Sequence, residues 1–185
     1  STALGSTIVL KLLSDQPIFA PELGIYSHRI GDTWLAGGAS NCGGKTLLQF
    51  FTAEQLAGLE AALDLTKPTG TDYYPLPSVG ERFPVSDPNL EPRLTPRPTD
   101  DAQFLQGIYE AFARIEQTGY AKLATLGGPK LRNVRHAGGG SRSTAWMTLR
   151  AQALGVPQHT AWSEEAAAGA ARLAWRSLGH EIAFT

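Results

Sequence analysis

The pattern of apolar and polar positions at the start of the chain is that of β-strands. Residues 7–13 are apolar at nearly every position and predict a strand that follows a Gly-Ser turn. Residues 25–30 and 33–36 flank a Gly-Asp pair, which is typical of a tight β-hairpin. The first part of the chain therefore predicts strands that pair with their neighbours.

Further along, apolar residues recur every three or four positions, which is the spacing of amphipathic helices. We expect a short helix through residues 47–51 and a second through residues 53–63, with Thr52 as its N-cap. A stretch rich in Pro, Gly and Asp follows over residues 66–98. Because long irregular segments in compact domains are usually functional or cover a surface, we expect one of these roles here.

The longest helix is expected over about residues 101–126, with Asp100 or Asp101 as its cap. The apolar face of this helix carries Phe104, Ile108, Phe112, Ile115 and Tyr120.

The last third of the chain alternates strand and helix patterns. Short strands are expected at residues 131–134 and near Val156, and helices at residues 143–154 and 166–178. Strands thus come first in pairs and later alternate with helices. This order predicts an α/β fold, a mixed sheet flanked by helices.

Composition bounds the function. A chain of 185 residues with 42% hydrophobic residues is expected to form one domain with a sizeable core. The net charge of −1 gives no general electrostatic reason to expect nucleic acid or an anionic membrane as partner. No apolar stretch is long enough to span a bilayer. The single Cys excludes an internal disulfide and fits a reducing compartment.

The first residues are not those of a signal peptide, since they lack a basic region. They also lack an initiator Met and lead directly into a strand pattern. We therefore expect the chain to be one lobe of a larger protein.

The candidate chemistry lies in glycine-rich turns. Gly5, Ser6 and Thr7 head a strand and offer backbone amides and two hydroxyls to a phosphate oxygen, although an ordinary turn fits as well. Residues 37–45 are expected to end the hairpin and open a helix. Their glycines and Lys45 are suited to an anion, and close packing of small residues is the alternative.

A third turn, at residues 138–140, joins a strand to a helix. It has neither the Lys-Ser/Thr of a P-loop nor the glycine spacing of the dinucleotide fingerprint. Trp146 follows on the helix, where an indole suits the stacking of an aromatic base. Packing between helices is the alternative for Trp146.

No catalytic or metal-binding set emerges from the remaining residues. The four histidines lack metal-ligand spacing, and no Ser-His-Asp set can be assembled. We interpret Cys42 as a small wall residue rather than a nucleophile, because no base can be paired with it.

Taken together and in this order, the turns resemble the C-terminal lobe of the FGGY carbohydrate kinases, ATP-dependent sugar kinases of the actin-like (ribonuclease H-like) ATPase fold. The resemblance covers nearly all of residues 1–185. The branch is similar to cyanobacterial and plant-plastid sugar kinases related to xylulokinase and ribulokinase. The similar segments are residues 4–7, 26–29, 34–41, 104–108, 138–141 with Trp146, and 165–171.

The resemblance implies roles toward the nucleotide phosphates for the first glycines. Gly5, Ser6 and Thr7 would lie against the phosphates, with Gly5 and Ser6 at the cleft. Gly38 and its neighbours would approach the ribose and the phosphates.

It also implies an adenosine wall. Gly139 and Gly140 would underlie the adenosine, and Trp146 would flank the adenine ring. Family members often carry Asn where this chain has Ser143. Loss of that amide would remove a hydrogen bond worth about 1 kcal/mol if nothing replaces it.

Finally, the resemblance implies what lies outside this chain. The general-base Asp, the first phosphate loop and most sugar contacts would belong to an N-terminal lobe, so no catalytic or metal-binding residue is expected here. ATP and Mg²⁺ would be the cofactors, and the sugar a ketopentose, D-ribulose before D-xylulose. A non-catalytic lobe for assembly or regulation is the alternative. The expected compartment is the cytoplasm, or a plastid in a plant.

Overall fold

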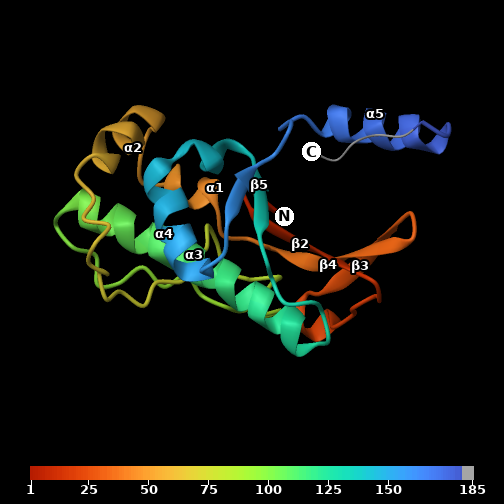
Figure 1. Ribbon diagram of the computed structural model, residues 1–185. Helices are drawn as coiled ribbons and strands as arrows, with labels where there is room; N and C mark the ends of the chain where they lie inside the picture. Colours follow the sequence, from red (N-terminus) through yellow and green to blue (C-terminus); the bar gives the residue numbers. More distant parts are fainter. Residues whose placement is uncertain (181–185) are drawn as a thin grey trace.

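The computed structural model describes residues 1–180, which form a mixed six-stranded sheet with helices packed on it (Figure 1). The strand order is β3-β4-β2-β1-β5-β6. The expected α/β class with a mixed sheet is therefore confirmed. The strands are β1 (Thr2–Leu4), β2 (Ile8–Ser14), β3 (Tyr26–Ile30), β4 (Thr33–Ser40), β5 (Val134–Ala137) and β6 (Gln158–Thr160).

One half of the sheet is antiparallel and comes from the first forty residues. β2 pairs with both β1 and β4, and β3 pairs with β4. Alternate residues of β2 are buried, Ile8 and Leu10 completely, which is why this run forms a strand with one face in the core. The expected strand and hairpin are thus confirmed.

β4 runs farther than expected, because Gly37 and Gly38 are strand residues and not a turn. A Cβ on Gly37 would lie 1.9 Å from the carbonyl oxygen of Leu10, and one on Gly38 would lie 2.4 Å from the ring of Phe83. The chain needs glycine at these positions for close packing inside the sheet, so the expected hairpin exit at residue 37 is wrong.

The other half of the sheet is parallel. β5 pairs with β1 and with β6, each in parallel. Since β4 also runs in the direction of β1, the carboxyl ends of β1, β4 and β5 meet at one edge of the sheet. In α/β sheets this is the edge at which ligands bind.

Helices α2 and α3 begin where capping residues predict. Thr52 and Gln55 form a capping box at α2, and the Asp100 carboxylate accepts the amide of Ala102 at the start of α3. The expected helix over residues 47–51 is wrong, because α1 ends at Leu47 and residues 48–50 form a turn. The helices are η1 (Pro21–Leu23), α1 (Gly44–Leu47), α2 (Ala53–Glu60), α3 (Asp101–Thr125), η2 (Gly139–Arg142), α4 (Thr144–Leu154) and α5 (Ala166–Ser177).

The core lies between the sheet and α3, and α4 packs on α3 beside it (Figure 1). The irregular segment 66–98 covers this core, as expected, and inserts Phe83 between β4 and α3. A Cβ on Gly119 of α3 would lie 2.6 Å from the Phe83 ring, so the ring fills the space left by glycines on both elements.

Helix α5 follows β6 and lies apart from α3 and α4 (Figure 1). Among residues 1–180, no helix combines the length and the apolar character that crossing a membrane requires.

Candidate functional site

Two glycine turns lie backbone against backbone at the carboxyl edge of the sheet. The first turn, residues 5–7, joins β1 to β2. The second turn, Gly43 and Gly44, precedes α1. The amide of Gly44 donates to the carbonyl of Gly5 at 2.9 Å, and a Cβ on Gly43 would lie 2.8 Å from the carbonyl oxygen of Ser6. The absence of side chains here is therefore what lets the two turns meet.

The third turn, residues 138–140, packs against the end of β1. A Cβ on Gly138 would lie 2.7 Å from the carbonyl oxygen of Leu4, and Gly138 has a positive φ of 94° that suits glycine. A Cβ on Gly140 would lie 3.0 Å from the Leu4 Cβ. Since Leu4 directly precedes the first turn, the structure brings all three turns together.

The three turns expose backbone at this edge. Gly5, Ser6 and Gly139 are exposed, and Thr7 and Gly140 are half-buried. A ligand that approaches the edge therefore meets main-chain atoms and small hydroxyls.

Gly38 does not reach this edge, which corrects its expected place. It is buried in the middle of β4, under the Phe83 ring and 2.7 Å, at its Cβ position, from the Gly24 carbonyl oxygen. The glycines that do reach the edge from this segment are Gly43 and Gly44. A glycine pair directly before a helical pattern is the signal in the sequence that distinguishes them.

Trp146 also lies elsewhere than expected. It is 1% exposed, stacks on Tyr109 with ring centroids 5.5 Å apart, and contacts Phe112 at 4.9 Å. Its faces are covered by the protein's own rings, so an adenine cannot stack on it in this geometry. Instead its edge supports Gly140 from below, since a Cβ on Gly140 would lie 2.3 Å from the indole.

Ser143 caps the helix that follows the third turn. Its hydroxyl accepts the amide of Trp146 at 3.0 Å, which satisfies one of the free N–H groups at the start of α4. The hydroxyl is thus already engaged in holding α4, whichever ligand the turn meets.

No pattern in the sequence indicates Glu81, a buried carboxylate behind the second turn. It is 3% exposed and accepts the hydroxyl of Ser40 and the amide of Asn41, each at 2.6 Å. Burial and the nearby Glu81 charge raise the pKa of Cys42. The thiol therefore stays protonated, in agreement with its expected role as a small wall residue.

A second buried carboxylate, Glu116 of α3, lies among β1, α3 and α4, where it accepts the hydroxyl of Thr2. It pairs with Arg150 of α4, which is fully buried and donates through two nitrogens, one of them at 2.7 Å. Arg150 also lies 3.2 Å from Nδ1 of His136 in β5. Because arginine only donates, Nδ1 must accept, so the imidazole proton is on Nε2. Burial and Arg150 lower the pKa of His136.

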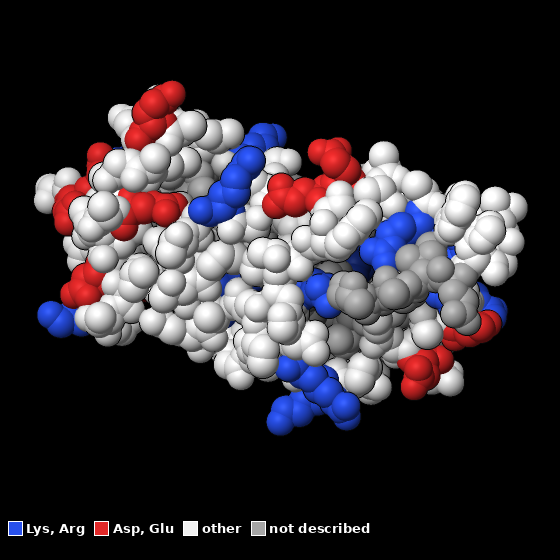
Figure 2. Space-filling view, turned by 45° about the horizontal axis from the view of Figure 1, so that its top comes forward, with Lys and Arg blue, Asp and Glu red and all other residues white. Residues whose placement is uncertain are grey.

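On the face drawn in Figure 2, Asp and Glu gather mostly at the left, Lys and Arg lie mostly in the middle and at the lower edge, and wide uncharged areas separate them. Within residues 1–180 there is no cluster of three His, Cys, Asp or Glu side chains suited to a metal ion. A hollow of about 690 Å³ adjoins Glu81 and is lined by Tyr26, Asn41 and Arg82, among other residues.

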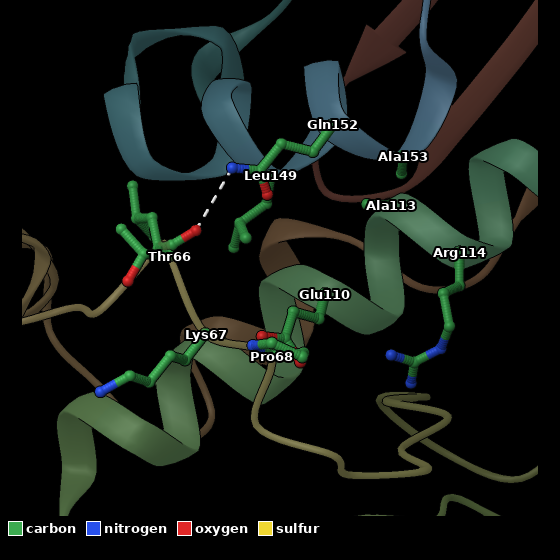
Figure 3. A pocket seen from close by; sticks show the side chains of 10 residues that line it. Thr66, Lys67, Pro68, Glu110, Ala113, Arg114, Leu149, Gln152 and Ala153 are labelled. Carbon is green, nitrogen blue, oxygen red and sulfur yellow. Dashed lines mark hydrogen bonds between the residues drawn. The ribbon is translucent and has the colours of Figure 1, made fainter.

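A second hollow, of about 450 Å³, lies away from the turns. It opens between α3, the C-terminal half of α4 and residues 65–68, with Glu110 and Gln152 on its walls (Figure 3). Gln152 Nε2 donates to the carbonyl of Leu65 at 3.2 Å and closes one side. Because α4 begins at the glycine edge and Gln152 is near its other end, this hollow is separate from the site.

Several solved structures similar to this chain are carbohydrate kinases. A xyloylose kinase from Brucella ovis is 26% identical, with a TM-score of 0.81 over 97% of this chain and 39% of its own. A gluconate kinase from Lactobacillus acidophilus (18%, TM-score 0.81) and a Plasmodium falciparum glycerol kinase with ADP (13%, TM-score 0.73) each cover 98% of this chain. The chain spans 39% of the length of each of these relatives.

The match to a family extends over almost the whole sequence. Residues 1–178 match the C-terminal domain of the FGGY family of carbohydrate kinases. The mixed sheet and its flanking helices are those of the actin-like ATPase fold that these kinases share. The chain therefore belongs to the FGGY family of carbohydrate kinases, as its C-terminal domain.

Proposed function

We propose that this domain binds ATP for a sugar kinase that transfers the γ-phosphoryl group to a hydroxyl of a ketopentose. The observation that carries the proposal is the meeting of three glycine turns at the carboxyl edge of the sheet, where added Cβ atoms would collide with neighbouring backbone. Phosphates bind at such places because main-chain N–H groups can approach them closely.

In this proposal the first two turns face the phosphates. Gly5, Ser6 and Thr7 line them on one side, and Gly43 and Gly44 hold this turn in place. Lys45 is exposed at the start of α1, and its amide donates to the carbonyl of Ser6 at 3.2 Å. Its ammonium group is therefore suited to a phosphate oxygen as a flexible point charge.

The third turn takes the adenosine. Gly139 and Gly140 underlie the nucleoside, and Trp146 holds them from below instead of flanking the base. The glycerol kinase with ADP shares this fold at 13% identity, which supports a nucleotide for the fold without fixing individual contacts. The hydroxyl of Ser143 caps α4 and remains the candidate that replaces the Asn common in the family.

Chemistry requires partners outside this chain. Mg²⁺ on the nucleotide would neutralise the charge that develops on the phosphates during transfer. The general base that takes the proton of the sugar hydroxyl, an Asp in this family, would come from an N-terminal lobe. This domain would hold the nucleotide while that lobe binds and activates the sugar. The cytoplasm or a plastid stays the proposed compartment, which rests on the single cysteine.

The test is an assay of ADP release by the full-length kinase with ATP and either D-xylulose or D-ribulose. The sequence resemblance favours D-ribulose before D-xylulose, and the name of the Brucella relative, a xyloylose kinase, is a reason to assay both sugars. Release that depends on either ketopentose supports the proposal. ADP binding without release for any sugar would instead assign a non-catalytic lobe for assembly or regulation.

A further inference from the structure

Glu81 is a buried carboxylate that several donors hold from different parts of the chain. Its Oε1 accepts the amides of Asn41 and of Arg82, the latter at 2.8 Å. Its Oε2 accepts the hydroxyls of Ser40 and Tyr74, at 2.6 and 3.1 Å. Ionised carboxylates accept such bonds more strongly than neutral groups do, so this arrangement is a firm anchor.

Among the described residues, no Lys, Arg or His pairs with this carboxylate. Within residues 1–180, none of the ion pairs closer than 4.0 Å includes Glu81. A buried charge is tolerated only where hydrogen bonds replace its hydration. An apolar side chain would fill the same space without that requirement, so the role of the Glu81 carboxylate depends on the donors that it accepts from.

The anchor leads directly to the glycine edge. The Ser40 hydroxyl, itself held by Glu81, accepts the amide of Cys42 at 3.0 Å. The carbonyl of Cys42 accepts the amide of Ile8 at 2.9 Å. The next residues are Gly43 and Gly44, which pack on the first turn through backbone contacts alone.

Because Gly43 and Gly44 have no side chains, the first turn contacts the second turn through main-chain atoms only. The position of the backbone at residues 5–7 therefore depends on the position of the backbone at residues 40–44. Displacements of about 1 Å at a phosphate-binding group cost up to about a hundredfold in rate. The position of Glu81 therefore bears on the nucleotide and not only on folding.

We propose that Glu81 is a positioning residue for the nucleotide phosphates: its carboxylate fixes residues 40–42 and thereby the backbone of the first and second turns. This inference rests on the proposed function, since it takes the first turn to face the phosphates. Glu81 touches neither nucleotide nor sugar and acts through the main chain.

The test compares steady-state kinetics of the full-length kinase with Glu81→Leu and Glu81→Gln. The leucine has no acceptor, so the KM for ATP is expected to rise at least about tenfold while the KM for the sugar stays unchanged. The glutamine keeps Oε1 for both amides, and its NH₂ can donate to the hydroxyls of Ser40 and Tyr74. Its KM for ATP is therefore expected to stay within about threefold of the wild type.

A matched control is Glu110→Leu. Glu110 likewise accepts a backbone amide and the hydroxyl of one residue from a distant segment, here Thr69 at 3.0 and 2.5 Å. It stands at the separate hollow of Figure 3, and Thr69 is not part of the glycine turns. Glu110→Leu is expected to lower stability and leave both KM values unchanged.

The outcomes separate this inference from the function on which it rests. If Glu81→Leu lowers kcat alone, or if both leucine variants shift the KM for ATP equally, the inference is overturned and Glu81 is only structural. If Glu81→Leu does not fold, Glu81→Asp decides: its shortened carboxylate is expected to raise the KM for ATP, and an unchanged KM refutes the role. If the wild type turns over no sugar, the proposed function fails. The dissociation constant of ADP, measured by calorimetric titration for the wild type and each variant, then replaces the KM for ATP in the comparison above.

Discussion

The two sides of the glycine edge are held by different forces. On the side of the first and second turns, hydrogen bonds from main-chain amides and from hydroxyl groups converge on Glu81, which forms no ion pair within residues 1–180. On the side of the third turn, Gly140 rests on the buried Trp146 of α4, and Arg150 of the same helix forms a buried ion pair with Glu116 of α3. A hydrogen-bonded support is weakened when its acceptor is removed, whereas a packed support is weakened when a side chain becomes larger or smaller. The two sides should therefore respond to different substitutions.

The largest effect is expected at the ion pair. Glu116→Leu leaves Arg150 buried without its partner and should lower the free energy of unfolding by about 3–5 kcal/mol, measured by urea denaturation. The double variant with Arg150→Met replaces the pair by apolar groups and should regain most of this loss. A single variant as stable as the wild type would show that this pair does not stabilise the packing of α4 on α3.

A smaller effect is expected from added volume at the third turn. Gly140→Ala places a Cβ 2.3 Å from Trp146 and should cost about 1–3 kcal/mol of unfolding free energy and weaken ADP binding. Gly139→Ala is the control for stability, because its Cβ meets only the end of the Arg142 side chain, at 3.3 Å. Calorimetric melting measures the stability of both variants, and ADP titration measures binding by Gly140→Ala. Equal losses in the two variants would contradict the packing of Gly140 on Trp146.

On the side of the first and second turns, the substitution to test is at Lys45, an exposed residue whose removal takes away a positive charge without changing the core. Lys45→Ala should weaken ATP binding by about 0.2–1 kcal/mol, and the difference should shrink at high salt. Lys67→Ala, at an exposed position away from the turns, should leave the affinity unchanged. An effect of the same size in both variants would indicate general electrostatics instead of a phosphate contact.

The smallest effect concerns pH. The pKa of His136 is lowered in the folded protein, so the unfolded state binds more protons as the pH falls below about 6.5. Stability should therefore decline toward acid. His136→Asn keeps an acceptor for Arg150 and removes the titration, so its melting temperature should fall less between pH 7 and pH 5. Parallel pH profiles would exclude His136 as the cause.

Much of the fold follows from periodicity, and the exceptions have a common origin. β2, the hairpin, α2 and α3 were predicted because their apolar spacing and caps are local. Gly37 and Gly38 resemble a turn, and only the approach of Leu10 and Phe83 makes them strand residues. The position of Trp146 in the sequence, shortly after the third turn, fits contact with a ligand as well as burial. Its packing against Tyr109 and Phe112 of α3 shows that it is buried.

The buried carboxylates could not have been predicted. Glu81 meets residues about forty positions earlier in the chain, and Glu116 meets Arg150 thirty-four positions later. Nothing in the local sequence marks either pairing. The glycine turns could be predicted because each is a short pattern of neighbouring residues. Glu81 and Trp146, which hold these turns in position, reach them only through the fold.

The central claim, that the three turns form one nucleotide site, can be tested by amide hydrogen exchange of the full-length kinase with and without ADP and Mg²⁺. The account predicts slower exchange with nucleotide in peptides that contain residues 5–7, 43–45 and 138–143. A peptide covering residues 64–72, at the separate hollow, should exchange at an unchanged rate. Protection confined to that peptide, or absent from all three turns at saturating ADP, would contradict the account.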